Sequence, residues 1–196
     1  MARKVWTNRR KWLGNLLPAL FFLPLNVWGI YWMMQNETIL GKGLWLVALG
    51  TVCGWIGLNL FGLVGNAYMR RALKRELVAK HVDFNDPHFF VGFASPKFIN
   101  ILDAHEDIGF LFLREEMVEF VGESNNVKVP KVQIQRVIFR PNVHTWVGIG
   151  RWICIEGLHK KTRFRLSIEP RERNFLLMNL IGSGAIKKRI LDWLKG

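Results

Sequence analysis

Two long stretches without a charged side chain open the sequence: WLGNLLPALFFLPLNVWGIYWMMQN at residues 12–36 and GLWLVALGTVCGWIGLNLFGLVGNAYM at residues 43–69. A helix needs about 20 mostly apolar residues to cross the hydrocarbon core of a bilayer. Both stretches are long enough. They predict an α-helical membrane hairpin, with spans over about residues 13–34 and 44–66.

Basic residues on either side of the stretches predict their orientation. Five lysines and arginines precede the first stretch and five follow the second within residues 70–80, whereas residues 35–42 hold only Lys42. Lys and Arg concentrate on the cytoplasmic side of spanning helices. We therefore expect an integral protein of an inner or plasma membrane with both termini in the cytoplasm. The first stretch is too long for the apolar core of a signal peptide, so we expect it to be retained.

The charge balance separates the two parts of the chain. Residues 1–80 carry 11 Lys/Arg against 2 Asp/Glu, a net +9, and residues 81–196 carry 17 against 13, a net +4. The excess positive charge flanks the apolar stretches, which is typical of a membrane protein and not of a nucleic-acid binder. The two cysteines, Cys53 and Cys154, form neither a disulfide framework nor a zinc pattern.

The second stretch is rich in glycine, and its small residues predict a helix-packing interface at Gly50, Gly54 and Gly57. This face receives a spanning helix of a partner protein, or packs against the first stretch of the same chain, or reflects only the tolerance of membrane helices for glycine. Neither stretch contains Asp, Glu, Lys, Arg or His. That excludes a proton relay, an ion pathway or histidine ligation of a pigment within the bilayer.

From Phe89 onward the apolar residues alternate, which indicates β-strands. We predict strands at residues 89–93, 108–113, 117–121, 127–129, 132–139, 152–156 and 162–169. A turn is expected at residues 157–160, and an apolar helix face over 171–194, interrupted near Gly182 and Gly184. The fold class is therefore a membrane α-helical hairpin plus an α+β domain, a small antiparallel barrel or sandwich with a C-terminal helix. Residues 1–82 form the hairpin with a juxtamembrane helix, and residues 83–196 form the cytoplasmic domain.

Two segments of this domain carry a family resemblance: GFLFLREEMVEFVG at residues 109–122 and VKVPKVQIQRV at residues 127–137. They resemble the opening hairpins of GRAM and bacterial pleckstrin-homology-like domains. The resemblance implies a pleckstrin-like barrel whose open end is capped by the terminal helix. It also implies a binding module, although one fold hosts many functions.

A group of basic residues is expected on the surface of this domain, where it could contact anionic headgroups. Its members are Lys160, Lys161, Arg163, Arg165, Arg171 and Arg173. Arginine binds phosphate in a bidentate manner, so a specific ligand is one interpretation and a solvated strand face is the other. Aromatic residues do not interleave with the basic ones, so no nucleic-acid partner is expected.

Potential metal ligands are densest at Asp103, His105 and Asp107. No second ligand cluster accompanies them, which favours a polar loop over a metal site. The spacing shows no Ser-His-Asp or Cys-His arrangement, and Gly148-Ile-Gly150 lacks the helix that a nucleotide site needs. We therefore expect a protein that is not an enzyme and holds neither metal nor cofactor. An enzyme that uses residues 103–107 is the weakest of the hypotheses.

Two functions remain. The first is a non-catalytic, membrane-anchored accessory or scaffold subunit that docks onto the transmembrane subunits of a larger complex. The alternative is a module that binds anionic lipid or its headgroups. Membrane lipids are partners in both.

Overall fold

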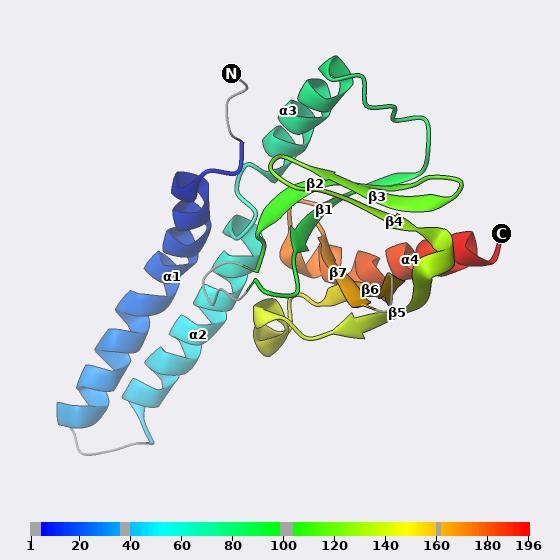
Figure 1. The fold of residues 1–196 in the computed structure, drawn as a ribbon. Helices are drawn as coiled ribbons and strands as arrows, with labels where there is room; N and C mark the ends of the chain where they lie inside the picture. The colour runs from blue at the N-terminus through cyan, green and yellow to red at the C-terminus, as the bar shows by residue number, and fades with distance from the viewer. Residues whose placement is uncertain (1–4, 36–39, 99–103, 160–161) are drawn as a thin grey trace. The chain divides into compact units, whose positions relative to one another are not determined.

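The chain divides into two compact units in the computed structural model, which describes residues 5–35, 40–98, 104–159 and 162–196 (Figure 1). One unit is a helix pair within residues 8–64. The other is a sheet unit that combines residues 5–7 with residues 65–196.

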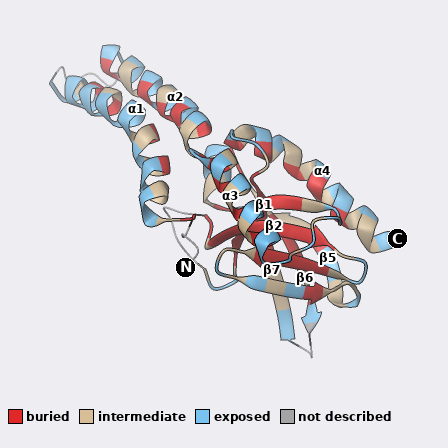
Figure 2. Cartoon of the chain, turned by 90° about the horizontal axis from the view of Figure 1, so that it is seen from above, coloured by how far each residue is buried: buried red, intermediate tan, exposed pale blue. Residues whose placement is uncertain are grey.

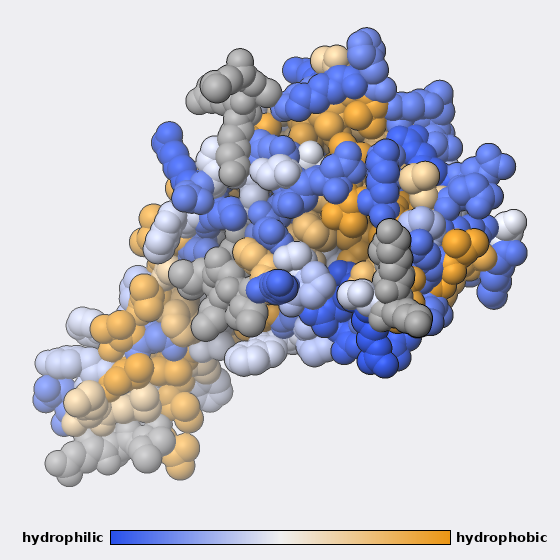
Figure 3. All heavy atoms as spheres, in the orientation of Figure 1, coloured by the Kyte–Doolittle hydropathy of each residue, from blue (hydrophilic) through white to orange (hydrophobic). Residues whose placement is uncertain are grey.

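The helix pair consists of α1 (Asn8–Gln35) and α2 (Lys42–Phe61). α1 and the helical stretch that begins at Lys42 are both long and apolar enough to cross a membrane. Their hydrophobic surface is orange in Figure 3. The helices pack antiparallel, since Gly14 of α1 faces Gly62 after α2 and Gly29 faces Gly43. α1 stays helical through Pro18 and Pro24.

Seven antiparallel strands form one sheet in the order β4-β3-β2-β1-β7-β6-β5. They are β1 (His88–Ala94), β2 (Asp107–Leu113), β3 (Met117–Gly122), β4 (Asn126–Pro130), β5 (Ile134–Arg140), β6 (Trp152–His159) and β7 (Thr162–Pro170). Two 3-10 helices, η1 (Lys131–Gln133) and η2 (Val143–Val147), flank β5. Together with α3 (Asn66–Ala79) and α4 (Leu176–Lys195), this makes an α+β unit, and the predicted strands lie within a few residues of the observed ones.

α4 covers the main hydrophobic core of the sheet unit, which appears red in Figure 2. Its residues Ile186 and Ile190 pack against inward side chains that include Leu111, Phe120 and Leu166. This burial supplies the main driving force for folding of the unit, since buried apolar area contributes roughly 25 cal/mol per Å².

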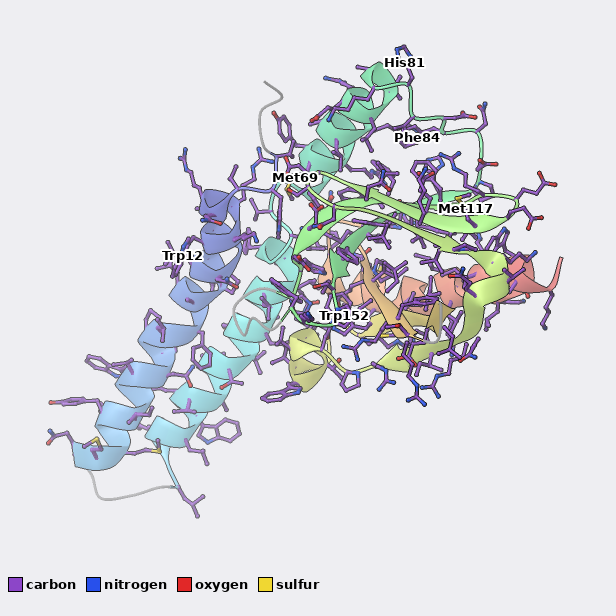
Figure 4. The ribbon with its side chains drawn as sticks, in the orientation of Figure 1. Trp12, Met69, His81, Phe84, Met117 and Trp152 are labelled. Atoms are coloured by element: carbon purple, nitrogen blue, oxygen red, sulfur yellow. The ribbon has the colours of Figure 1, made fainter. Side chains whose placement is uncertain are left out.

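A second apolar cluster joins α3 to the other side of the β1–β2 strands. Met69, Leu73 and Leu77 of α3 pack in one cluster with Phe90 and Phe110, and Met69 is labelled in Figure 4. β2 is consequently buried along its whole length, which explains its nearly continuous apolar sequence. Residues 65–82, which the sequence placed with the hairpin, are therefore grouped with the sheet unit by their contacts, as are residues 5–7.

The predictions for the C-terminal helix are partly wrong. The helix face was expected to unite Phe175, Met178 and Ile181 with Ile186 and Ile190, but the first three side chains point outward, 45%, 54% and 68% exposed. α4 also begins only at Leu176 and runs through its glycines without interruption.

The predicted turn at residues 157–160 is displaced as well. β6 continues to His159. Gly157 therefore lies within the strand, where it pairs with Phe164 of β7. Glycine is required at this position in the strand because a Cβ there would clash with the backbone oxygen of Gln133.

Candidate functional site

A pocket of about 540 Å³ lies on the face of the sheet formed by β5, β6 and β7. It is lined by Pro96, Gln135, Arg136, Arg140, Glu156, Gly157, Arg163, Phe164 and Arg165. Strand register explains the grouping. Arg136 of β5 lies opposite Glu156 of β6, which in turn lies opposite Arg165 of β7, so the three form one row across the strands.

Glu156 is shared by the two arginines of β5. Arg136 Nη2 lies 2.7 Å from its Oε2, and Arg140 Nε donates to its Oε1 at 2.7 Å. The hydrogen bond from Arg140, with that from Arg136, lowers the pKa of Glu156 and keeps it ionised at neutral pH. Four arginines against one glutamate leave the pocket with a formal charge of +3.

The two arginines of β7 have less protein pairing than those of β5. Arg165 Nη2 makes a long 3.5 Å hydrogen bond to the Pro96 carbonyl oxygen. Its Nε is buried without a hydrogen-bond partner in the described parts of the chain. Arg163 is exposed. A buried donor without an acceptor costs about 1–3 kcal/mol, so this side of the pocket favours an added anion.

The expected basic surface group is therefore only partly assembled. Arg163 and Arg165 come together in the pocket, whereas Arg173 is exposed and does not line it. Lys160 and Lys161 lie outside the described residues. Arg136 and Arg140 were not predicted as site residues, although their even spacing within a predicted strand places them on one face.

The prediction of a surface position for Arg171 is wrong. Its side chain is 1% exposed, and its Nε donates to Asn66 Oδ1 at 3.1 Å. Its guanidinium lies 4.5 Å from the ring centroid of Trp6. Asn66 also donates to the Arg171 carbonyl oxygen at 2.6 Å. Arg171 is thus an internal tie between segments far apart in sequence.

Beside Arg171 lies a buried cluster that centres on Glu169. The carboxylate contacts His105 Nε2 at 2.9 Å and His144 Nδ1 at 2.9 Å. The two imidazoles lower the pKa of Glu169 far below its ordinary value, against the opposing effect of burial. Glu169 and His144 were not predicted as site residues, because residues 105, 144 and 169 meet only through the fold.

Burial lowers the pKa of His105, so this imidazole is neutral at pH 7. Its Nε2–H then donates to Glu169, and its Nδ1 accepts a hydrogen bond from Arg171 Nη1 at 3.4 Å. Trp152, labelled in Figure 4, packs edge-on against the ring. These contacts balance the buried charges of Glu169 and Arg171.

The candidate ligand group at residues 103–107 is not assembled in the structure. Asp103 lies outside the described residues, and His105 belongs to the Glu169 cluster. Asp107 instead accepts hydrogen bonds from the backbone amides of Ser124 at 2.9 Å and Asn125 at 2.7 Å. Within the described ranges, no three His, Cys, Asp or Glu side chains are placed to hold a metal ion.

The glycine face of α2 lies against α1. A Cβ at Gly54 would approach Phe22 Cβ to 2.7 Å, and one at Gly57 would lie 3.1 Å from the Phe21 ring. A Cβ at Gly50 would clash with the Asn26 amide. The small residues therefore let the two helices of this chain approach closely, and a partner helix could not occupy the same face.

Comparisons of the chain with protein-family models, with curated proteins and with solved structures find no match.

Proposed function

We propose that this protein is a membrane-anchored module that binds a phosphate-bearing anionic headgroup in the arginine-lined pocket. The observation that carries the proposal is the convergence of four arginines on one pocket that contains a single carboxylate. Guanidinium groups form bidentate, charge-assisted hydrogen bonds with phosphate oxygens. Arg163 and Arg165 are the direct contacts in this proposal, while Arg136 and Arg140 add positive potential.

Membrane anchoring is supported by the N-terminal segment as well as by the apolar helices. The Trp6 amide donates to Glu123 of the sheet unit at 2.8 Å, and the Val5 amide contacts the same carboxylate. Residues before α1 and after α2 therefore belong to one folded unit. This is compatible with two membrane crossings, which return the chain to the side it started from. The distribution of Lys and Arg supports the cytoplasmic side of an inner or plasma membrane.

The strand order and the terminal helix support a pleckstrin-like assignment for the sheet unit, in line with the GRAM-like hairpins of the sequence. Consecutive strands β1 to β4 are neighbours, as are β5 to β7, and α4 packs on the core of the sheet. Because a fold does not determine function, the proposal depends on the pocket and not on this assignment.

Isothermal titration of the full chain in phosphatidylcholine nanodiscs tests the proposal, with glycerol 3-phosphate and inorganic phosphate as probes. We expect binding that weakens with salt and is lost in the double variant Arg163→Gln/Arg165→Gln. The matched control is Arg71→Gln/Arg75→Gln, which removes the same charge from the exposed side of α3. Equal binding by both variants would refute the proposal.

A second arm distinguishes a lipid headgroup from a free phosphate compound. Nanodiscs that contain phosphatidic acid should compete with the soluble probe if the ligand is a lipid. Undiminished probe binding in those nanodiscs would assign the pocket to a soluble ligand.

A second candidate, the accessory subunit, is favoured by a groove of about 370 Å³ in the helix pair. Trp28, Trp32, Lys42, Trp45, Leu46 and Leu49 line this groove. We propose that an apolar spanning helix of a larger complex fits there, on a side that the glycine face leaves open. Purification from native membrane in a gentle detergent tests it: a partner should be retained by the wild type and lost with Trp45→Ala. Purification of the wild type and of Trp45→Ala as lone monomers would exclude this function.

A further inference from the structure

The outer side of α4 changes character along its length. Beginning with Phe175, just before the helix, its exposed residues Met178, Ile181 and Ala185 are apolar. Farther along, the exposed residues are Lys188, Arg189, Asp192 and Lys195. A helix side in contact with water is normally polar throughout. The first half of α4 is therefore adapted to a different environment from the second half.

Hydrogen bonds fix where this apolar half lies within the sheet unit. Asn66 Nδ2 donates to the Arg173 carbonyl oxygen at 3.1 Å, and Asn179 Oδ1 accepts from the Arg173 amide at 2.8 Å. Arg70 Nη1 also pairs with Glu172 at 2.9 Å. The start of α4 is thus attached to the start of α3.

The start of α3 is close to the apolar span along the chain. α2 ends at Phe61 and α3 begins at Asn66. Five residues of fully extended chain reach at most about 18 Å. If α2 crosses a bilayer, residues 66 and 173 must therefore lie near the bilayer surface. The apolar half of α4 begins at this same place.

We infer that Phe175, Met178 and Ile181 form a membrane-interfacial surface that dips into the boundary between headgroups and acyl chains. The exposed Arg173 would lie beside it among the phosphates. The inference rests on the membrane anchoring of the proposed function, but not on ligand binding in the pocket. It also gives the three outward side chains an environment in which their exposure has no cost.

A lipid surface fits these residues better than a protein partner does. A stable protein interface buries about 800 Å² on each side. Three neighbouring side chains followed by a charged helix side offer much less. A lipid contact needs no such area, because the spans already hold the domain at the surface.

Site-specific labelling of the full chain in liposomes tests the inference. An environment-sensitive NBD group is attached at Met178→Cys in a Cys53→Ala background, where the remaining Cys154 is 0% exposed and resists labelling. The matched control is Val132→Cys, which replaces another exposed apolar residue. The Lys131 ammonium lies 5.0 Å from the ring centroid of Trp193, so this control lies near the far end of α4, about 22 Å along the helix from Met178.

We expect lipids with a nitroxide near the headgroup to quench the label at residue 178 severalfold more than at residue 132, with a blue-shifted emission. Equal quenching and equal spectra at the two positions would overturn the inference. The anchoring control is the wild-type protein labelled at Cys53 in α2. Nitroxides deep in the acyl chains should quench this label. Loss of that signal would overturn the anchoring together with this inference, whereas loss of phosphate binding alone leaves the labelling result unchanged.

Discussion

The imidazole of His105 occupies the space in which a Cβ of residue 92 would stand. Gly92 lies on β1 opposite Glu169 of β7, so the ring lies over the strand with its Nε2 2.9 Å from the Glu169 carboxylate. The absence of a side chain at Gly92 is therefore what admits the histidine to the buried cluster.

Replacement of Gly92 by alanine should destabilise the sheet unit by about 1–3 kcal/mol or more, because the added methyl displaces a ring held by Glu169 and Trp152. Thermal unfolding of the full chain in detergent, followed by near-UV circular dichroism, measures the loss. Gly182→Ala is the control, since nothing lies within 4 Å of a Cβ there. It should stabilise α4 by up to about 1 kcal/mol. Similar behaviour of the two variants would contradict the assigned role of Gly92.

The His105 cluster should make stability depend on pH. Burial holds the pKa of His105 below its ordinary value of 6.5, so the unfolded chain takes up a proton first as the pH falls. Stability should be level above about pH 6.5 and decrease below it. The lowered pKa of Glu169 contributes further stability above its ordinary value of 4.5, and this contribution is lost progressively as the pH falls below that value.

His105→Gln should reduce the dependence of stability on pH between pH 6.5 and 5, although His144 still contacts Glu169. Denaturant titrations at several pH values provide the measurement. His81→Asn removes an exposed imidazole outside the cluster, at a positive φ of 61° that asparagine tolerates. In His81→Asn the dependence of stability on pH should match that of the wild type. A His105→Gln slope that also matched the wild type would show that the cluster does not control the acid response.

The close approach of α1 and α2 should fail when Gly54 is enlarged. Gly54→Leu drives a side chain into Phe22, whose Cβ already lies 2.7 Å from the position of a Cβ at residue 54. We expect a loss of about 1–3 kcal/mol, seen as a lower unfolding temperature in detergent. Val52→Leu enlarges a residue of the same helix that is 54% exposed, and should have little effect. If both variants unfolded at the same temperature as the wild type, the glycine face would not determine the helix packing.

Asp107 should stabilise the β3–β4 hairpin through its contacts with the turn at residues 124–125. Asp107→Ala leaves the amides of Ser124 and Asn125 without their acceptor, at an expected cost of about 1–3 kcal/mol. Hydrogen exchange of those amides reports the effect directly. Asp83→Ala removes an exposed carboxylate with one local hydrogen bond, to the Asn85 amide, and serves as the comparison. Unchanged protection at residues 124 and 125 would argue against this anchor.

The local pattern of apolar residues was enough to predict the strands. It was not enough to predict which side chains outside the strands are buried. Short apolar or alternating runs located the strands, although β1 and β2 are buried on both sides and alternate less than the others. The face of α4 was misassigned because helical spacing groups Phe175 with Ile186 without indicating which of them meets the sheet. The sequence likewise gave no sign that Arg171 is buried, because its partner Asn66 lies 105 residues away.

The candidate site, too, was predicted only as far as one strand reveals it. Arg163 and Arg165 were identified from one strand, yet the pocket also needs Arg136, Arg140 and Glu156 from two others. Their grouping depends on strand register, which a single sequence leaves undetermined. The glycine face was recognised from spacing alone, but only the packed helices show that α1 covers it.

The division of the sheet unit into two segments has a consequence for its biosynthesis. Val5 and Trp6 pack with Met69 and Leu73 in one apolar cluster, although both apolar helices separate them in the chain. A fragment that starts at residue 83 would lose this cover and expose Phe90 and Phe110 to solvent. The sheet unit can therefore close only after both helices have been synthesised, because residues 5–7 come before the helices and residues 65–196 come after them.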